Sequence, residues 1–266
     1  MTELLLVRHG QTDGNLHGRW QGWDENPLNQ QGEREAALIA RRLAQTEEAI
    51  AALYASPLGR AWQTAECIGE ALNLSPVPHD GLKEINFGQI RGITVDEFRE
   101  RFPDLHKRWA DKTDLSFTFP GGEQRAQFFQ RVGEAIEGIV ERRPDQRVVV
   151  VAHGGTLRAG LIHYLPAEFG QWWTYELGNC SLTRLEVREG QAKLLVLDDR
   201  AHLAEEGAGE LQFCFQKPGQ PLPRDFPRQD SPAGFGDEPL DTSPCSGSAQ
   251  HLVHRDTWPQ HLEGEP

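Results

Sequence analysis

The sequence predicts an α/β protein, a three-layer α/β/α sandwich with a mostly parallel central sheet. Two observations carry this prediction. Strand-like and helix-like patterns alternate through residues 1–200, as they do in α/β domains. The apolar runs LLLV at 4–7 and VVVV at 148–151 are not interrupted by polar residues. Such runs are typical of parallel strands that helices cover on both faces.

The elements follow from hydrophobic periodicity and from the positions of glycine and proline. Strands are expected at 3–8, 52–56, 147–152, 181–187 and 192–197. Helices are expected at 31–45 and 58–72, and within 94–111, 123–143 and 156–165. In the first of these helices, Ala36, Ile39, Ala40 and Leu43 share one face. That apolar stripe indicates a helix packed on a sheet.

The composition of the chain changes near residue 200. Residues 201–266 contain nine of the 17 prolines, and eleven acidic residues against four basic ones. A segment of this kind buries too little apolar surface to offset the entropy lost on ordering. We therefore expect a catalytic domain over 1–203 and an acidic, Pro/Gly-rich tail over 204–266 that is disordered or loosely docked. Three histidines, at 251, 254 and 261, suggest a metal site in this tail, but their spacing alone does not carry one.

Charge and cysteine usage limit the partners. The formal net charge of −13 opposes non-specific binding to nucleic acid or to an anionic membrane. No apolar run approaches the roughly 20 residues of a membrane span, and there is no N-terminal leader pattern. The four cysteines form no Cys-x-x-Cys motif, which fits a reducing compartment. We expect a cytoplasmic protein whose partner is a small molecule. The oligomeric state is left open, with a homodimer as one alternative.

Polar side chains follow two of the buried strands directly. The first strand ends in RHG at 8–10, and the run VVVV is followed by HGG at 153–155. In open α/β sheets, ligands bind beyond the carboxyl ends of the strands. If these two strands are neighbours, His9 and His153 face each other across one crevice, and the adjacent glycines let backbone amides approach an anion. Taken alone, either histidine has an ordinary structural alternative.

Two further segments add charged groups to this picture. The stretch SPLGRAWQTA places Arg60 in the first turn of a helix, where a cation opposes the helix dipole unless it has an anionic partner. A phosphate would be such a partner, because a guanidinium binds phosphate oxygens bidentately. In KEINFGQIRG, Glu84 lies in a turn-like segment. A loop glutamate is usually just solvated, but beside two arginines and two histidines it is a candidate proton donor.

In this order, the motifs resemble the histidine phosphatase superfamily, the phosphoglycerate mutase-like group, over about residues 3–198. RHGQTDGN is similar to the family's phosphate loop, and GRWQGWDENPLNQQG is similar to the segment that follows it. SPLGRAWQTA and KEINFGQIRG are similar to the arginine-bearing and acid-bearing segments, and FPGGE, VVAHGG and NCSLTRLE continue the match. The resemblance implies a phosphoglycerate mutase-like fold.

The resemblance also implies the role of each site residue. His9 is the expected nucleophile, which takes the phosphoryl group on a ring nitrogen. It must be neutral, so its other ring nitrogen should donate to a fixed acceptor such as a backbone carbonyl. Glu84 is the expected proton donor to the leaving oxygen and must therefore start out protonated. The phosphoryl oxygens are expected to be held by Arg8, Arg60 and His153, with Asn15, Gln21, Gly22 and Gly154 completing the binding pocket. Neither a metal nor another cofactor is expected.

Three functions remain open at this point. The favoured one is a phosphomonoesterase that acts on a small phosphorylated metabolite. The first alternative is a cofactor-dependent phosphoglycerate mutase, but family mutases carry a longer, basic insertion than the roughly 30 residues between Phe87 and Phe119. The second alternative is a non-catalytic scaffold that binds a phospho-ligand. Inactive relatives usually lack one of the reacting groups, and here all of them are present.

Overall fold

The computed structural model describes residues 1–46, 49–165 and 172–204. Its strands are β1 (Thr2–Arg8), β2 (Ile50–Ala55), β3 (Val77–Pro78), β4 (Arg147–Ala152), β5 (Leu182–Arg188) and β6 (Gln191–Asp199). Its α-helices are α1 (Asp13–Leu16), α2 (Gln30–Thr46), α3 (Gly59–Leu72), α4 (Val95–Arg101), α5 (Pro103–Ala110), α6 (Arg125–Arg142) and α7 (Gly154–Tyr164). Short 3-10 helices are η1 (Asp80–Leu82), η2 (Gly88–Ile90) and η4 (Ala201–Ala204).

All six strands belong to one sheet, in the order β3-β2-β4-β1-β5-β6. The pairs β3–β2, β2–β4 and β4–β1 are parallel. Strand β5 runs antiparallel to both of its neighbours. The sheet is therefore mostly parallel, as predicted. The one reversed strand, β5, belongs to the β5–β6 hairpin at one edge of the sheet. In the register of β1 and β4, Arg8 is opposite Ala152, so both strands end at the same level.

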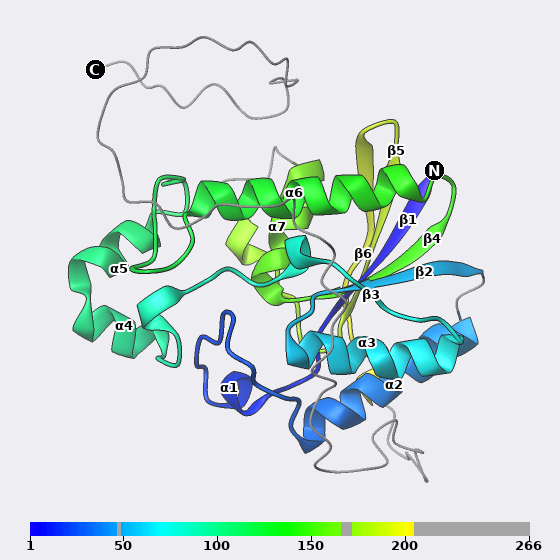
Figure 1. The fold of residues 1–266 in the computed structure, drawn as a ribbon, viewed down its shortest axis with the longest axis horizontal. Helices are drawn as coiled ribbons and strands as arrows, with labels where there is room; N and C mark the ends of the chain where they lie inside the picture. Colours follow the sequence, from blue (N-terminus) through cyan, green and yellow to red (C-terminus); the bar gives the residue numbers. More distant parts are fainter. Residues whose placement is uncertain (47–48, 166–171, 205–266) are drawn as a thin grey trace, which may run out of the picture. The chain divides into compact units, whose positions relative to one another are not determined.

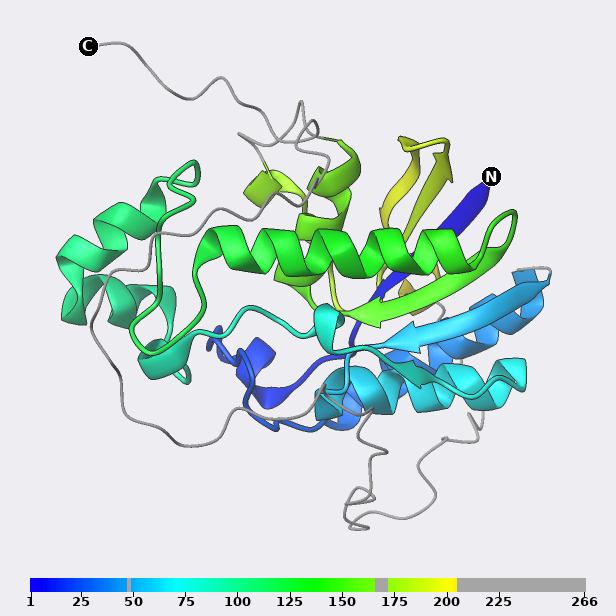
Figure 2. The ribbon, with the colours of Figure 1, turned by 45° about the horizontal axis from the view of Figure 1, so that its top comes forward.

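Helices cover both faces of this sheet, which confirms the three-layer prediction. Alternate residues of β1 and β4, Leu4 and Val148 among them, pack against α6 and α7 on one face. The residues between them, such as Leu5 and Val149, pack against α2 and α3 on the other. Figures 1 and 2 show these two helical layers with the sheet between them. Each strand therefore needs apolar side chains on both faces, which is why the runs LLLV and VVVV do not alternate with polar residues.

A third, smaller cluster lies around α4 and α5, at the opposite end of the sheet from the amino terminus (Figure 1). Helix α4 begins with a capping box, in which Thr94 and Glu97 satisfy each other's backbone N–H groups. Pro103 at the first turn of α5 separates the two helices. The cluster is built from aromatic side chains contributed by distant segments: Trp20, Phe87, Phe98, Phe102, Trp109, Phe117 and Phe119.

The predicted elements agree closely with the observed ones. All five predicted strands form, and each helical region contains α-helix. Strand β3 was not predicted, because two residues show no periodicity. Except for Ala204, the predicted tail and its three histidines lie outside the described residues, so the domain boundary stays a prediction. Among the helices of residues 1–46, 49–165 and 172–204, none combines the length and apolar character needed to cross a membrane.

Candidate active site

A cavity of about 360 Å³ opens beyond the carboxyl ends of β1 and β4. The motifs that predict the site therefore converge on one place although they are far apart in the chain. Eight of the nine predicted site residues line the cavity: Arg8, His9, Asn15, Gln21, Gly22, Arg60, Glu84 and Gly154. The ninth, His153, is 1% exposed and lies beside His9, with 5.1 Å between the ring centroids.

His9 is buried at the end of β1, and its ring orientation is set by the backbone. Its Nδ1 lies 2.7 Å from the carbonyl oxygen of Gly10, which can only accept, so Nδ1 carries the proton. Nε2 accepts a hydrogen bond from Nε of Arg60 over 3.3 Å. Burial, followed by the charges of Arg60 and Arg8, holds the pKa of His9 well below its usual value. The imidazole is therefore neutral at neutral pH, as a nucleophile at this position must be.

His153 occupies the N-cap position of α7, without a side-chain hydrogen bond to the helix, and is neutral for similar reasons. Burial is the main cause that lowers its pKa far below the usual value, and the charge of Arg60 is the next. Its Nε2 lies 2.7 Å from the hydroxyl oxygen of Ser56, the first residue of the stretch SPLGR. Its Nδ1 is buried and has no hydrogen-bond partner in the described part of the chain. An unsatisfied buried group of this kind marks a place where a ligand can complete the bonding.

Two arginines, Arg8 and Arg60, supply positive charge beside His9. Arg60, 1% exposed, donates from Nη2 to the carbonyl of Gly22 over 2.8 Å and from Nη1 to the carbonyl of Asp24 over 3.1 Å. Burial lowers the pKa of Arg60 to about 10, so its guanidinium stays charged at neutral pH. Arg8 donates from Nη1 to the carbonyl of Leu177, while its buried Nε has no partner within the described residues. Carbonyl acceptors fix both guanidinium groups without neutralising their charge.

The carboxylate of Glu84 is held against the first turn of α7. One oxygen accepts from the backbone N–H of Gly155 and the other from that of Ile85, each over 2.9 Å. A side chain at position 155 would collide with this carboxylate, because a Cβ there would lie 3.1 Å from Cδ of Glu84 and nearer still to one oxygen. Glycine at 155 is therefore what allows Glu84 to reach the cavity from its loop.

Asn15 and Gln21 belong to the loop that follows β1. Asn15 closes a capping box with Thr12, and its Oδ1 accepts from the backbone N–H of Thr12 over 3.1 Å. Oε1 of Gln21 accepts from the Thr12 hydroxyl over 2.9 Å. Both amide oxygens are used inside the loop, which leaves the amide N–H groups as the donors that these two cavity-lining residues can offer to a ligand. Gly14 leaves the room for Gln21, since a Cβ there would lie 2.7 Å from its side chain.

Several functional candidates were missed by the sequence reasoning. Ser56 and Asn179 lie within motifs already quoted, SPLGR and NCSLTRLE, which was the available signal. Asn179 donates from Nδ2 to the carbonyl of His9 over 2.9 Å and so links the loop before β5 to the end of β1. Arg158 and Lys112 also line the cavity, and no pattern in the sequence distinguishes them from ordinary surface cations.

The described residues contain no group of three or more His, Cys, Asp or Glu side chains placed to hold a metal ion. What they do present is a neutral imidazole between two fixed guanidinium groups, with a carboxylate and the first amides of α7 at the rim. Donors that converge in this way suit an anion with several oxygens. A neutral imidazole in their midst suits covalent transfer of that anion.

Comparison with known proteins agrees with this geometry. The family sequence model of the histidine phosphatase superfamily (branch 1) matches residues 4–200. The chain belongs to this superfamily. Phosphoserine phosphatase 1 of Hydrogenobacter thermophilus is 33% identical over 205 residues, which cover 77% of this chain and 96% of that protein. The probable phosphoglycerate mutase GpmB of Yersinia pestis is 31% identical over 220 residues, which cover 80% of this chain and 100% of that protein.

The fold is likewise similar to solved structures. One is a mutant phosphoserine phosphatase from Entamoeba histolytica in complex with phosphoserine, which matches with a TM-score of 0.68 and 27% sequence identity. The match covers 76% of this chain and 100% of the other. The phosphoglycerate mutase-like fold predicted from the motifs is therefore confirmed.

Proposed function

We propose that this chain is a phosphomonoesterase that hydrolyses small phosphorylated metabolites through a phosphohistidine on His9. The observation that carries the proposal is the state of His9. Its Nδ1 is committed to the carbonyl of Gly10, and its pKa is lowered by burial and by two arginines. Nε2 therefore holds a lone pair toward a cavity that is built to attract an anion. Membership of the histidine phosphatase superfamily supports the same function.

In the first step, Nε2 of His9 attacks phosphorus, the N–P bond forms and the bond to the ester oxygen breaks. This step requires Glu84 to carry a proton, which it gives to the departing oxygen, so the leaving group departs as a neutral alcohol. The three phosphoryl oxygens carry the charge of the transition state, and phosphoryl transfer is catalysed mainly by positioning and by compensating charge. Arg8 and Arg60 supply that charge here.

In the second step, a water molecule attacks the phosphohistidine. Glu84, now a carboxylate, takes a proton from this water, the N–P bond breaks, and inorganic phosphate is released with His9 neutral again. His153 donates from Nδ1 to a phosphoryl oxygen, because its Nε2 then accepts from the hydroxyl of Ser56. Asn15 and Gln21 donate from their amide groups, and Gly154 presents a backbone N–H at the start of α7.

A mutase is the second candidate, and the named Yersinia relative is the observation that favours it. A mutase must keep water away from the phosphohistidine while its substrate reorients in the site. The segment between Phe87 and Phe119 that could do so contains only η2, α4 and α5, and its apolar side chains are spent on the aromatic cluster around Trp20. Hydrolysis is therefore the favoured outcome. Phosphoserine is the first substrate to try, since two of the relatives described above are named phosphoserine phosphatases.

The test compares wild-type protein with His9→Ala on p-nitrophenyl phosphate and on phosphoserine, with released phosphate as the readout. We expect phosphate release by the wild type and a loss of more than about 10³-fold in the variant. Isomerisation of 3-phosphoglycerate that depends on a bisphosphorylated primer, with little phosphate release, would select the mutase. Binding of a phosphate analogue without turnover would select a non-catalytic scaffold. A cytoplasmic location stays a prediction, and the oligomeric state stays open.

A further inference from the structure

We propose that Lys112 is a specificity-determining residue, which binds a second anionic group carried by the leaving group of the substrate. This inference rests on the proposed phosphomonoesterase function and narrows its substrate class. It concerns the outer wall of the cavity, where the substrate's alcohol portion would lie. That wall is formed by aromatic side chains of the cluster around α5, among them Trp20, Phe87, Trp109 and Phe119.

Cations outnumber anions along this cavity. Among the described residues that line it, Glu84 has the only carboxylate, against six cationic side chains: Arg8, Arg19, Arg60, Lys112, Arg125 and Arg158. A single phosphate, with Arg8 and Arg60 around it, leaves four of these cations to be accounted for. The contacts of each show which one is available to a second anion.

Three of the four are already committed. Arg19 pairs with Glu97 and donates to the carbonyl of Gly92. Arg125 keeps its charge, but both of its Nη atoms donate to backbone carbonyls, those of Trp109, Asp111 and Asp114. Arg158 donates from Nε to the carbonyl of Tyr175, and its Nη1 would lie 3.8 Å from a Cβ at position 154, beside the phosphate end of the cavity.

Lys112 differs from these three. Its Nζ lies 3.0 Å from the centroid of the Trp109 ring and donates to the carbonyl of Trp109 over 3.1 Å. Within residues 1–46, 49–165 and 172–204, no carboxylate lies within ion-pair distance of it. A half-buried ammonium on an aromatic ring, at a cavity wall and with no counter-ion, is an incomplete ion pair.

The groups that face Lys112 do not complete that pair. From α6, Arg125 adds a like charge. From the segment that follows α7, Trp172 presents only its indole N–H, which lies 3.5 Å from the Lys112 carbonyl. On its own segment, the carboxylate of Asp111 accepts from Thr113, and that of Asp114 accepts from Ser116 and Arg108. No carboxylate among the described residues pairs with this ammonium, so an anion carried by a ligand can do so.

Burial supports this reading through the protonation state. Desolvation, and then the charge of Arg125, lower the pKa of Lys112 to about 7. Below that pH the ammonium is charged and binds an anion, and above it the amine is neutral and does not. A bound anion favours the charged form, so selectivity for a second anion should decline as the pH rises through about 7 to 8.

A carboxylate and a second phosphate share the required chemistry, and matched substrate pairs separate them. The carboxylate pair is 3-phosphoglycerate against glycerol 3-phosphate, and the phosphate pair is glucose 1,6-bisphosphate against glucose 6-phosphate. The quantity measured is the ratio of kcat/KM within each pair, from which the ionisation of the reacting phosphate cancels. We expect a wild-type ratio of at least about tenfold for one of the pairs, the scale of one charge-assisted hydrogen bond.

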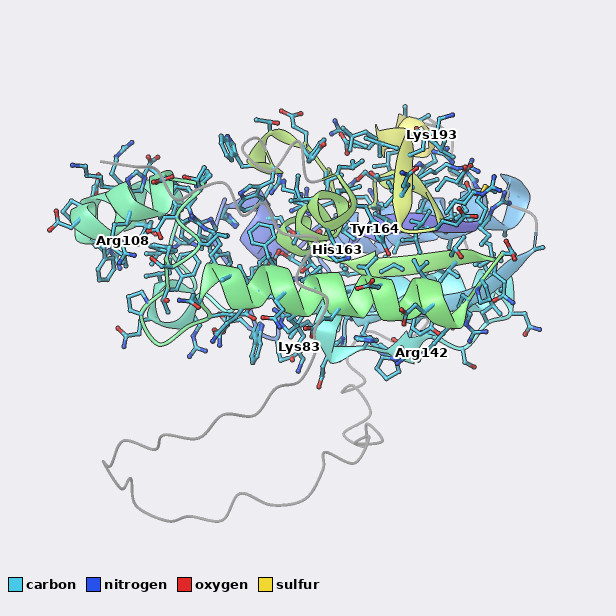
Figure 3. The ribbon with its side chains drawn as sticks, turned by 90° about the horizontal axis from the view of Figure 1, so that it is seen from above. Lys83, Arg108, Arg142, His163, Tyr164 and Lys193 are labelled. Carbon is cyan, nitrogen blue, oxygen red and sulfur yellow. The ribbon has the colours of Figure 1, made fainter. Side chains whose placement is uncertain are left out.

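The variant Lys112→Met keeps the length of the side chain and removes its charge. We expect it to bring that ratio down by about tenfold, mainly through KM of the doubly anionic substrate. The control is Lys193→Met, an exposed lysine on β6 that lies far from Arg108 on α5 (Figure 3). It should leave both ratios at their wild-type values.

The variant Lys112→Arg separates binding from a structural role. Arginine stays charged across the tested pH range, so the variant should retain the ratio and lose its decline above about pH 7. Equal ratios in wild type and Lys112→Met, or the same pH dependence in wild type and Lys112→Arg, would overturn the inference. Absence of hydrolysis of every substrate by the wild type would instead refute the proposed phosphomonoesterase function.

Discussion

Nε of Arg60 donates a hydrogen bond to Nε2 of His9 over 3.3 Å at the centre of the cavity. Because a guanidinium can only donate, Nε2 must carry the lone pair. The carbonyl of Gly10 fixes the proton on Nδ1 from the other side. The carbonyl of the next residue, Gly10, and an arginine from α3 therefore set the tautomer of His9 before any substrate arrives. In the proposed mechanism, an incoming phosphoryl group takes the place of Arg60 at Nε2, and Arg60 then binds its oxygens.

This relationship predicts that lysine cannot replace Arg60. The variant Arg60→Lys keeps a positive charge but cannot bind Gly22, Asp24 and the phosphoryl group at the same time. We expect kcat/KM for p-nitrophenyl phosphate to fall by about 10²-fold or more. The matched control is Arg34→Lys on the exposed side of α2, which should have no effect. Wild-type kcat/KM in Arg60→Lys would contradict the assigned role.

The contact between Glu84 and Gly155 gives a second prediction. In Gly155→Ala the new Cβ collides with the Glu84 carboxylate, the mobile end of a side chain, so Glu84 should move and the fold should remain. We expect kcat to fall by about 10- to 100-fold with little change in thermal stability, because the proton donor is displaced.

Gly154→Ala is the control for this variant. A Cβ at 154 meets nothing closer than Nε of Arg8 at 3.6 Å, which is ordinary contact. Its loss of activity should be clearly smaller than that of Gly155→Ala. Equal losses in the two variants would show that the position of Glu84 is not what limits the rate.

The sequence predicts this site well where a residue belongs to a local pattern. Arg8 and His9 end a buried strand, and Arg60 occupies a first helical turn, so the positions of their backbones follow from the elements alone. Their convergence follows from the order of the parallel strands, with β4 between β2 and β1. The resemblance to a known family supplied the roles, which strand and helix patterns do not contain.

What the sequence did not predict depends on tertiary contacts. Lys112 contacts the ring of Trp109, three residues earlier, and lies near a guanidinium from α6, but the local sequence does not show that these groups meet at the wall of a cavity. Asn179 reaches His9 across 170 positions of the chain. Short elements such as α1 and β3 form through capping and pairing rather than through periodicity, so pattern reading passes over them.

The buried neutral histidines predict how stability depends on pH. Burial lowers the pKa of His153 far below 6.5 in the folded state, whereas the unfolded chain takes up a proton near that value. Below about pH 6.5 the unfolded state thus binds more protons, so the free energy of unfolding falls as the pH falls. Each such histidine contributes a slope of up to about 1.4 kcal/mol per pH unit.

Urea unfolding at intervals from about pH 7 down to about pH 5 measures this slope. His153→Asn removes one of the two buried imidazoles of the site and should reduce the slope by up to about 1.4 kcal/mol per pH unit, with the full reduction at the acidic end of this range. His17→Gln, which removes an exposed histidine at the end of α1, is the control variant. The same slope in His153→Asn and wild type would show that His153 does not titrate differently in the two states.

The most direct test of the account is to trap the phosphorylated enzyme. Wild-type protein is mixed with a phosphate-labelled monoester, quenched in alkali, which preserves phosphohistidine, and digested for mass spectrometry without acid. We predict that the label is found on the peptide that contains His9, and that His9→Ala carries none and releases no phosphate. Turnover by the wild type with the label on another residue, or undiminished turnover by His9→Ala, would contradict the account.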